Sequence, residues 1–89
     1  MMEMHFYISG KVQGVGFRSV VHRHALHHKI NGFVRNLSDG RVEICAQGES
    51  QSIQNFFNDI QKNPGRAFIE RFDEEKVHCS KRYSSFEIQ

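Results

Sequence analysis

The chain has 89 residues and a formal net charge of only +2, from 12 Lys and Arg against 10 Asp and Glu. This length fits a single domain, residues 1–89, and the weak charge disfavours a nucleic-acid binder, which normally clusters many more basic residues. Eight Phe, one Pro and seven Gly argue against a disordered or low-complexity chain. A small anionic substrate held by one or two well-placed cations is compatible with this composition.

The cysteines and the N-terminal sequence indicate the cellular setting. Cys45 and Cys79 are far apart and form no CxxC pair typical of a metal or redox site. Two reduced thiols are expected, with a disulfide between them left open. The first residues contain no basic stretch leading into an apolar one, and no apolar run approaches about 18 residues. We therefore expect a soluble, cytoplasmic protein with no membrane segment.

The first predicted elements are a strand and a helix joined by a glycine-bearing loop. Aromatic and β-branched residues cluster over residues 4–10, which predicts a strand that ends at Gly10. From Phe17 to about His28, apolar residues recur at spacings of three and four, which predicts a helix.

A hairpin follows in the predicted order. Residues 32–37 and 41–46 are expected as strands, joined by the tight-turn signal Asp39-Gly40. The second strand alternates polar with apolar residues, so we expect one of its faces to be solvated.

The remainder of the chain predicts a second helix and two further strands. Residues 50–62 form an amphipathic pattern stopped by Asn63-Pro64-Gly65. A fourth strand begins over residues 67–72, and residues 83–88 form a short last strand.

This order is βαββαβ plus a short C-terminal strand. It predicts an α+β, ferredoxin-like split βαβ fold, in which two helices cover one face of an antiparallel sheet. A right-handed crossover further predicts that the first and third strands are adjacent and parallel.

The loop from Gln13 to Arg18 has the composition of an anion-binding site. Gly14 and Gly16 allow the backbone to curl, and N–H groups at a helix start have no intrahelical partner. The guanidinium of Arg18 offers bidentate donors that match phosphate oxygens. Taken alone, the loop is equally an ordinary strand-to-helix turn with a surface arginine, because neither the GxGxxG nor the Walker A pattern is complete.

Asn36 is the second candidate, at the end of a predicted strand. Its carboxamide both donates and accepts hydrogen bonds, so it can hold a water molecule aimed at phosphorus. The alternative role for Asn36 is local turn chemistry, in which the side chain bonds its own backbone.

Taken together, these stretches resemble the acylphosphatase family over essentially the whole chain. The resemblance is carried by the run Gly10-Lys11-Val12-Gln13-Gly14-Val15-Gly16-Phe17-Arg18, by Gly32-Phe33-Val34-Arg35-Asn36 leading into Asp39-Gly40-Arg41-Val42-Glu43, and by Tyr83-Ser84-Ser85-Phe86. The first run is highly specific, since it matches residue types at nine successive positions.

The resemblance implies a ferredoxin-like fold and two catalytic residues. Arg18 would hold the phosphate and Asn36 would orient the attacking water. Main-chain N–H groups from about Val15 onward would complete a cradle whose implied phosphate-binding residues are Gln13, Gly14, Val15, Gly16, Phe17 and Arg18. The implied reaction is hydrolysis of the carboxyl–phosphate bond of an acyl phosphate, without metal or cofactor. Inorganic phosphate would be its product or inhibitor, and a monomer is expected.

Two positions depart from the usual pattern of this family. A glycine commonly follows the first helix, where this chain has Lys29, and Phe33 stands where Trp is frequent. If forced into the left-handed conformation, Lys29 would cost about 1 kcal/mol. Neither change touches the two implied catalytic residues.

Three other interpretations remain open at this stage. An RNA-binding module shares the βαββαβ order, but its aromatic signature belongs on the third strand, where residues 41–46 contain no aromatic residue. An acylphosphatase-like regulatory or carrier domain would keep the fold without the activity. A divalent ion could bind the histidine-rich helix, which carries His22, His24, His27 and His28.

Overall fold

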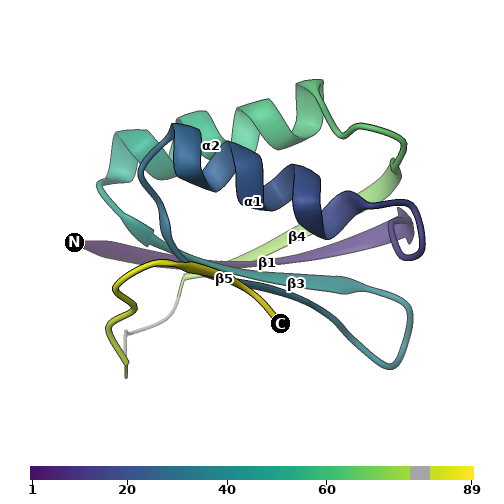
Figure 1. Cartoon of the computed structure of the whole chain (residues 1–89), viewed down its shortest axis with the longest axis horizontal. Coiled ribbons are helices and arrows are strands. Elements are labelled where there is room, and N and C mark those ends of the chain that lie inside the picture. The colour runs from purple at the N-terminus through teal and green to yellow at the C-terminus, as the bar shows by residue number, and fades with distance from the viewer. Residues whose placement is uncertain (77–80) are drawn as a thin grey trace.

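The computed structural model describes residues 1–76 and 81–89, and both helices cover one face of a five-stranded sheet (Figure 1). The elements in chain order are β1 (Met2–Lys11), α1 (Phe17–His27), β2 (Asn31–Asn36), β3 (Val42–Gly48), α2 (Ser50–Lys62), β4 (Phe68–Lys76) and β5 (Phe86–Ile88). Within the described residues, neither helix has the length and apolar character needed to cross a membrane. The pairing of Cys45 with Cys79 lies outside the described residues.

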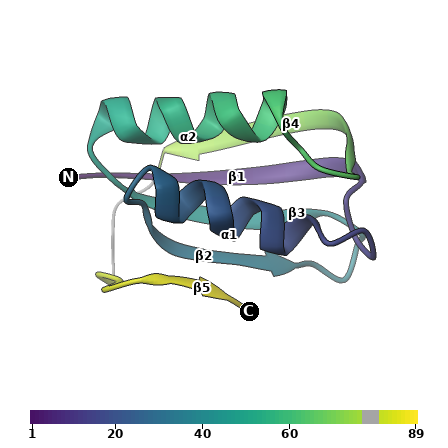
Figure 2. The ribbon, with the colours of Figure 1, turned by 45° about the horizontal axis from the view of Figure 1, so that its top comes forward.

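The strand order is β4-β1-β3-β2-β5, which confirms the ferredoxin-like α+β class. β1 and β3 are neighbours as expected, but they pair antiparallel, with Ile8 opposite Val42. The prediction of parallel pairing was wrong because the crossover through α1 leads from β1 to β2. These two strands run in the same direction, and β3 is inserted antiparallel between them (Figure 2). β5 pairs parallel to β2, so the sheet is mixed rather than purely antiparallel.

The hydrophobic core lies between the sheet and the helices. Successive side chains of a strand point to opposite faces, so alternate residues of β1 and β3 enter this layer. The ring of Phe6 stacks on that of Phe57 at a centroid distance of 5.2 Å. The buried residues of the core are Phe6, Ile8, Val12, Phe17, Val21, Ala25, Ile30, Val34, Val42, Ile44, Ala46, Ile53, Phe56, Ile60 and Phe86.

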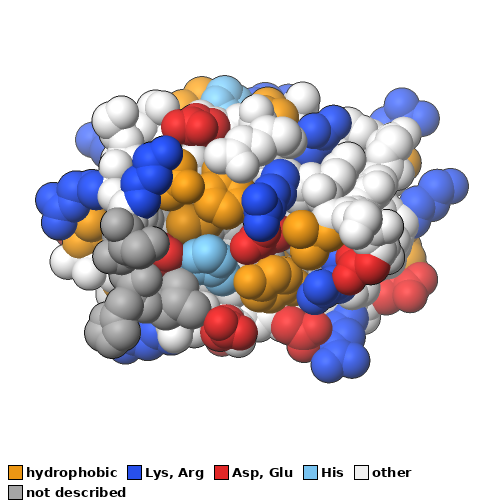
Figure 3. Space-filling model, turned by 90° about the horizontal axis from the view of Figure 1, so that it is seen from below, with side chains coloured by type: hydrophobic (Ala, Val, Ile, Leu, Met, Phe, Trp, Pro, Cys, Tyr) orange, Lys and Arg blue, Asp and Glu red, His pale blue; other side chains and the backbone are white. Residues whose placement is uncertain are grey.

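The face of the sheet that points away from the helices is only partly solvated. The polar side of β3 was expected to face water, but Glu43, Cys45 and Gln47 are 5%, 2% and 1% exposed. That prediction was wrong because β3 is the central strand, and side chains of the neighbouring strands together with Lys81 and Tyr83 cover it. Figure 3 shows this face, with acidic, basic and hydrophobic side chains close together around a histidine.

The end of α1 confirms the expected strain at Lys29. This residue has φ 57°, the only positive φ among the non-glycine residues that the structure describes. The N–H of Ile30 donates to the carbonyl oxygen of Ala25 at 2.9 Å, the closing bond of a C-terminal cap that glycine usually makes possible. The sharp exit from the helix therefore forces a side chain with a Cβ into a left-handed conformation.

Replacing Lys29 by Gly is expected to stabilise the protein. Relief of the left-handed strain should raise the free energy of unfolding by about 1 kcal/mol. Urea unfolding measures the change as a higher midpoint at an unchanged m-value. Lys29→Ala is the matched control, because it removes the long side chain but keeps the Cβ. An equal gain in Lys29→Ala would show that the strain at Cβ is not the cause.

Candidate active site

The loop between β1 and α1 leaves the start of the helix open to an anion. Gly14 and Gly16 both have φ 76°, a conformation that costs glycine little. In the part of the chain that the structure describes, no side chain caps the helix start at Gly16, and its first turn holds no acidic residue. The first N–H groups of α1 therefore have no acceptor from a capping side chain, and they lie at the positive end of the helix dipole.

A cavity of about 140 Å³ joins this loop to the neighbouring strand ends. It brings together four of the predicted phosphate-binding residues, Gly14, Gly16, Phe17 and Arg18, with the predicted catalytic residue Asn36. The other two predicted phosphate-binding residues, Gln13 and Val15, are not part of its lining. Val15 instead packs, partly buried, against the hydrophobic core.

The side chain of Gln13 ties the loop to the hairpin between β2 and β3. Its amide Nε2 donates two hydrogen bonds of 2.9 Å, to the carbonyl oxygens of Leu37 and Arg41. The sequence pattern predicted phosphate binding for Gln13, whereas its side chain connects the glycine-bearing loop to the hairpin that begins directly after Asn36. It therefore holds the two halves of the cavity at a constant separation.

Arg18 lies in the first turn of α1 and contacts the last strand segment. Its Nη1 donates a hydrogen bond of 2.8 Å to the main-chain oxygen of Gln89. A guanidinium has five N–H donors, so this bond leaves four for a ligand. Sequence reasoning missed this partner, and also Ile88 in the cavity lining, because the pairing of β5 with β2 is a tertiary contact without a sequence signal.

Asn36 is held by a tightly closed turn. It is exposed at the end of β2, and the N–H of Leu37 donates to the carbonyl oxygen of Arg41 at 2.8 Å. The carboxylate of Asp39 accepts bonds from the main-chain N–H of Arg41, at 3.0 Å, and from its Nε, at 2.8 Å. Both hydrogen bonds lower the pKa of Asp39, and the bond from the main-chain N–H of Arg41 has the larger effect. The carboxylate thus stays ionised and keeps the turn closed.

Two of the four histidines in and after α1, His24 and His28, contact α2 and the residue after it. The Nε2 atom of His24 lies 2.9 Å from the main-chain oxygen of Asn63, and that of His28 lies 2.5 Å from Oδ2 of Asp59. Hydrogen bonding to His28 lowers the pKa of Asp59. His24 and His28 therefore link α1 to α2, which weakens the interpretation that this pair of histidines binds a metal.

A glycine-bearing loop, an arginine and an asparagine thus line one cavity of a ferredoxin-like α+β fold, an arrangement suited to a small anionic ligand. The acylphosphatase family model matches residues 4–88. An acylphosphatase of Bacillus velezensis is 39% identical over 88 residues, which cover 99% of this chain and 98% of that protein. The chain therefore belongs to the acylphosphatase family and has its activity, the hydrolysis of acyl phosphates.

Solved structures agree with this assignment. The crystal structure of acylphosphatase from Bacillus subtilis superposes with a TM-score of 0.93 at 30% identity, covering 100% of this chain and 99% of that one. Full-length HypF in its phosphate- and nucleotide-bound form superposes with a TM-score of 0.91 at 32% identity, over 99% of this chain but only 12% of its own. The same fold thus occurs both alone and as a small part of a larger protein.

Gln13→Ala is expected to loosen the cavity without removing any group that lines it. Loss of two hydrogen bonds should lower the free energy of unfolding by about 1–2 kcal/mol. The substitution should also reduce kcat/KM by about tenfold, because Gln13 no longer connects the loop to the hairpin that begins after Asn36. Benzoyl phosphate hydrolysis and urea unfolding measure the two effects. Gln61→Ala, at an exposed position of α2, is the control, and equal behaviour of the two variants would contradict the role of Gln13.

Proposed function

We propose that the chain hydrolyses acyl phosphates by in-line attack of a water molecule held by Asn36 on a phosphate held by Arg18 and main-chain amides. The observation that carries this mechanism is the cavity shared by Gly14, Gly16, Arg18 and Asn36. In this proposal the chain works as one domain, residues 1–89, that is monomeric and cytoplasmic. It uses no cofactor, and inorganic phosphate is both its product and a competitive inhibitor.

The proposed catalysis depends on electrostatic complementarity to the phosphoryl group. A carboxylate is a good leaving group, so the transition state is loose, with negative charge spread over three equatorial oxygens. The first N–H groups of α1 and the guanidinium of Arg18 are already in position and need no reorganisation when this charge develops. One donor placed in this way is worth roughly 3–4 kcal/mol.

The attacking water is positioned by Asn36 and deprotonated by the substrate itself. Carboxylate and imidazole groups do not occur among the described residues that line the cavity. We infer that an oxygen of the phosphate accepts the proton of the water, and Asn36 contributes orientation only. A level profile of kcat/KM across neutral pH supports this route, whereas a steep dependence on an enzyme group there would contradict it.

Asn36→Ala is expected to abolish most turnover while phosphate still binds. Without the carboxamide the water loses its in-line position, which should lower kcat by about 100-fold or more. The inhibition constant of inorganic phosphate should stay at the wild-type value, because Arg18 and the amides remain. Benzoyl phosphate hydrolysis in the presence of EDTA measures both constants. Asn31→Ala, at the other end of β2, is the control, and full activity of Asn36→Ala would refute the assignment.

Arg18→Lys is expected to fail although it keeps the positive charge. An ammonium group cannot reproduce the planar bidentate fork of the guanidinium, so kcat/KM should fall by about 100-fold and phosphate should inhibit more weakly. The control is Arg23→Lys, an exposed position on the same helix, which should retain wild-type kinetics. If Arg18→Lys kept near-wild-type values of kcat/KM and of phosphate inhibition, a positive charge alone would be sufficient at this position and the bidentate fork would not be needed.

A further inference from the structure

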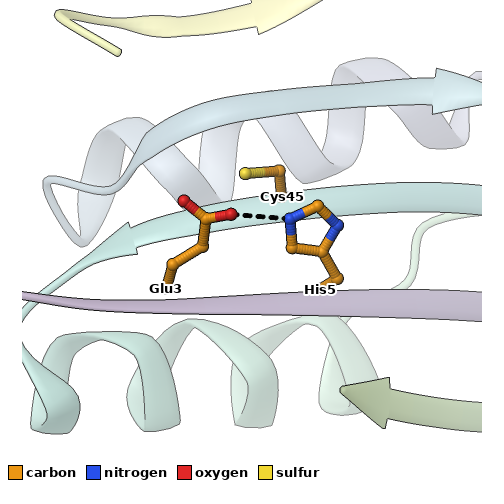
Figure 4. A group of neighbouring side chains, drawn as sticks. All are labelled: Glu3, His5 and Cys45. Atoms are coloured by element: carbon orange, nitrogen blue, oxygen red, sulfur yellow. Dashed lines mark hydrogen bonds and ion pairs between the residues drawn. The ribbon is translucent and has the colours of Figure 1, made fainter. Parts of the chain in front are cut away.

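The face of the sheet that points away from the helices holds three side chains of the metal-ligating kind. Glu3 and His5 project from β1 and Cys45 from β3 (Figure 4). A carboxylate oxygen, a ring nitrogen and the sulfur of these residues all lie within 4.8 Å of one another. Across the described ranges, this is the one group of three such residues that meets this spacing. Sheet register builds the group, because His5 is directly opposite Cys45.

Each nitrogen and oxygen ligand is oriented by a further polar side chain. The Nδ1 atom of His5 lies 3.3 Å from Oε2 of Glu43, so Nε2 is the nitrogen that faces Glu3, at 2.8 Å. Oε1 of Glu3 accepts a hydrogen bond of 2.7 Å from the amide of Gln47, which leaves Oε2 as the oxygen on the side of His5. A histidine whose second nitrogen faces a carboxylate is the usual arrangement behind a protein metal site.

The supporting carboxylate of Glu43 is itself held in place. Nε of Arg35 donates to its Oε1 at 2.6 Å, and the hydroxyl of Tyr7 donates to its Oε2 at 3.3 Å. Burial, followed by the charge of Glu43, raises the pKa of Tyr7, so the phenol keeps the proton that it donates. Glu43 is only 5% exposed, so this network shields the cluster from bulk water on the β2 side.

The cluster opens into a cavity of about 230 Å³ with a partly apolar wall. The rings of Phe33 and Tyr83 meet edge to face in this wall, with centroids 5.7 Å apart. Cys45 is 2% exposed and Glu3 9%, so both lie at the floor of the cavity. The space is ample for a metal ion and for one small ligand that completes its coordination.

We propose that Glu3, His5 and Cys45 form a binding site for a divalent transition-metal ion such as Zn²⁺. One thiolate, one imidazole and one carboxylate are the donor types that Zn²⁺ takes, and three protein ligands leave a fourth tetrahedral position facing the cavity. In a tetrahedral zinc site the nitrogen and oxygen lie about 3.3 Å apart and the nitrogen and sulfur about 3.6 Å. The most widely spaced pair of ligand atoms would thus have to close by about 1 Å.

This metal site is separate from the acyl phosphate site. Glu3 and His5 lie near the start of β1, whereas the loop that carries Arg18 follows its end. At about 3.3 Å per strand residue, the two sites are roughly 20–25 Å apart along the strand. Because the ion would bind the folded chain and link β1 to β3, it would stabilise the fold without entering the hydrolysis.

Co²⁺ is the spectroscopic probe for the proposed ligands. One equivalent of Co²⁺ added to the reduced protein should produce a thiolate-to-cobalt charge-transfer band, and one equivalent of Zn²⁺ should abolish the band and raise the Tm. The band should be lost in Cys45→Ala and strongly reduced in His5→Gln. Glu43→Gln, which keeps all three proposed ligands but removes the carboxylate behind His5, should weaken Zn²⁺ binding by about 10–100-fold.

The matched controls are Cys79→Ala and His27→Gln, both of which should keep the band. A cooperative thermal unfolding transition checks that each variant is folded, and in every folded variant the turnover of benzoyl phosphate should be unchanged and insensitive to EDTA. A wild-type spectrum without thiolate charge transfer would overturn the proposal, even if the variants fail to fold. A band that persists in folded Cys45→Ala, or one that requires Cys79, would overturn it as well.

Discussion

The insertion of β3 between β1 and β2 is the constraint on which both sites of this protein depend. Val42 is the partner of Ile8 on one side and of Asn36 on the other. With neighbouring strands about 4.8 Å apart, this pairing brings Ile8, three residues before the end of β1, to within about 10 Å of Asn36 at the end of β2. The glycine-bearing loop and Asn36 therefore meet at one end of the sheet, although Arg18 and Asn36 lie 18 positions apart in the chain.

The same central strand serves two different faces. Its apolar residues complete the core under the helices, and its polar residues Glu43 and Gln47 are buried on the other side, where they orient Glu3 and His5. A buried carboxylate is tolerated only when its oxygens are satisfied, and here arginine, tyrosine and histidine supply the donors. Along β3, the face of the sheet that points away from the helices thus carries buried charged and polar side chains that are joined by hydrogen bonds.

Hydrogen bonds from side chains connect the separate segments around the candidate catalytic cavity. The two bonds from Gln13 cross from the loop to the hairpin, and Arg41 closes the turn through Asp39. Such bonds allow exposed residues to keep a defined separation, which the proposed water-positioning role of Asn36 requires. The bond between Arg18 and the main-chain oxygen of Gln89 adds the last strand to the same frame.

The amino-acid sequence by itself determined the element order, the glycine-bearing loop, the family resemblance and the left-handed strain at Lys29. Each of these is a local property, because periodicity, turn residues and helix ends are set by side chains within a few positions. Only the tertiary structure decided that β1 and β3 run antiparallel, that Gln13 bonds the hairpin, and that β5 lies beside Arg18. It also decided that Cys45 meets His5, since cross-strand register joins residues that lie 40 positions apart and share no sequence signal.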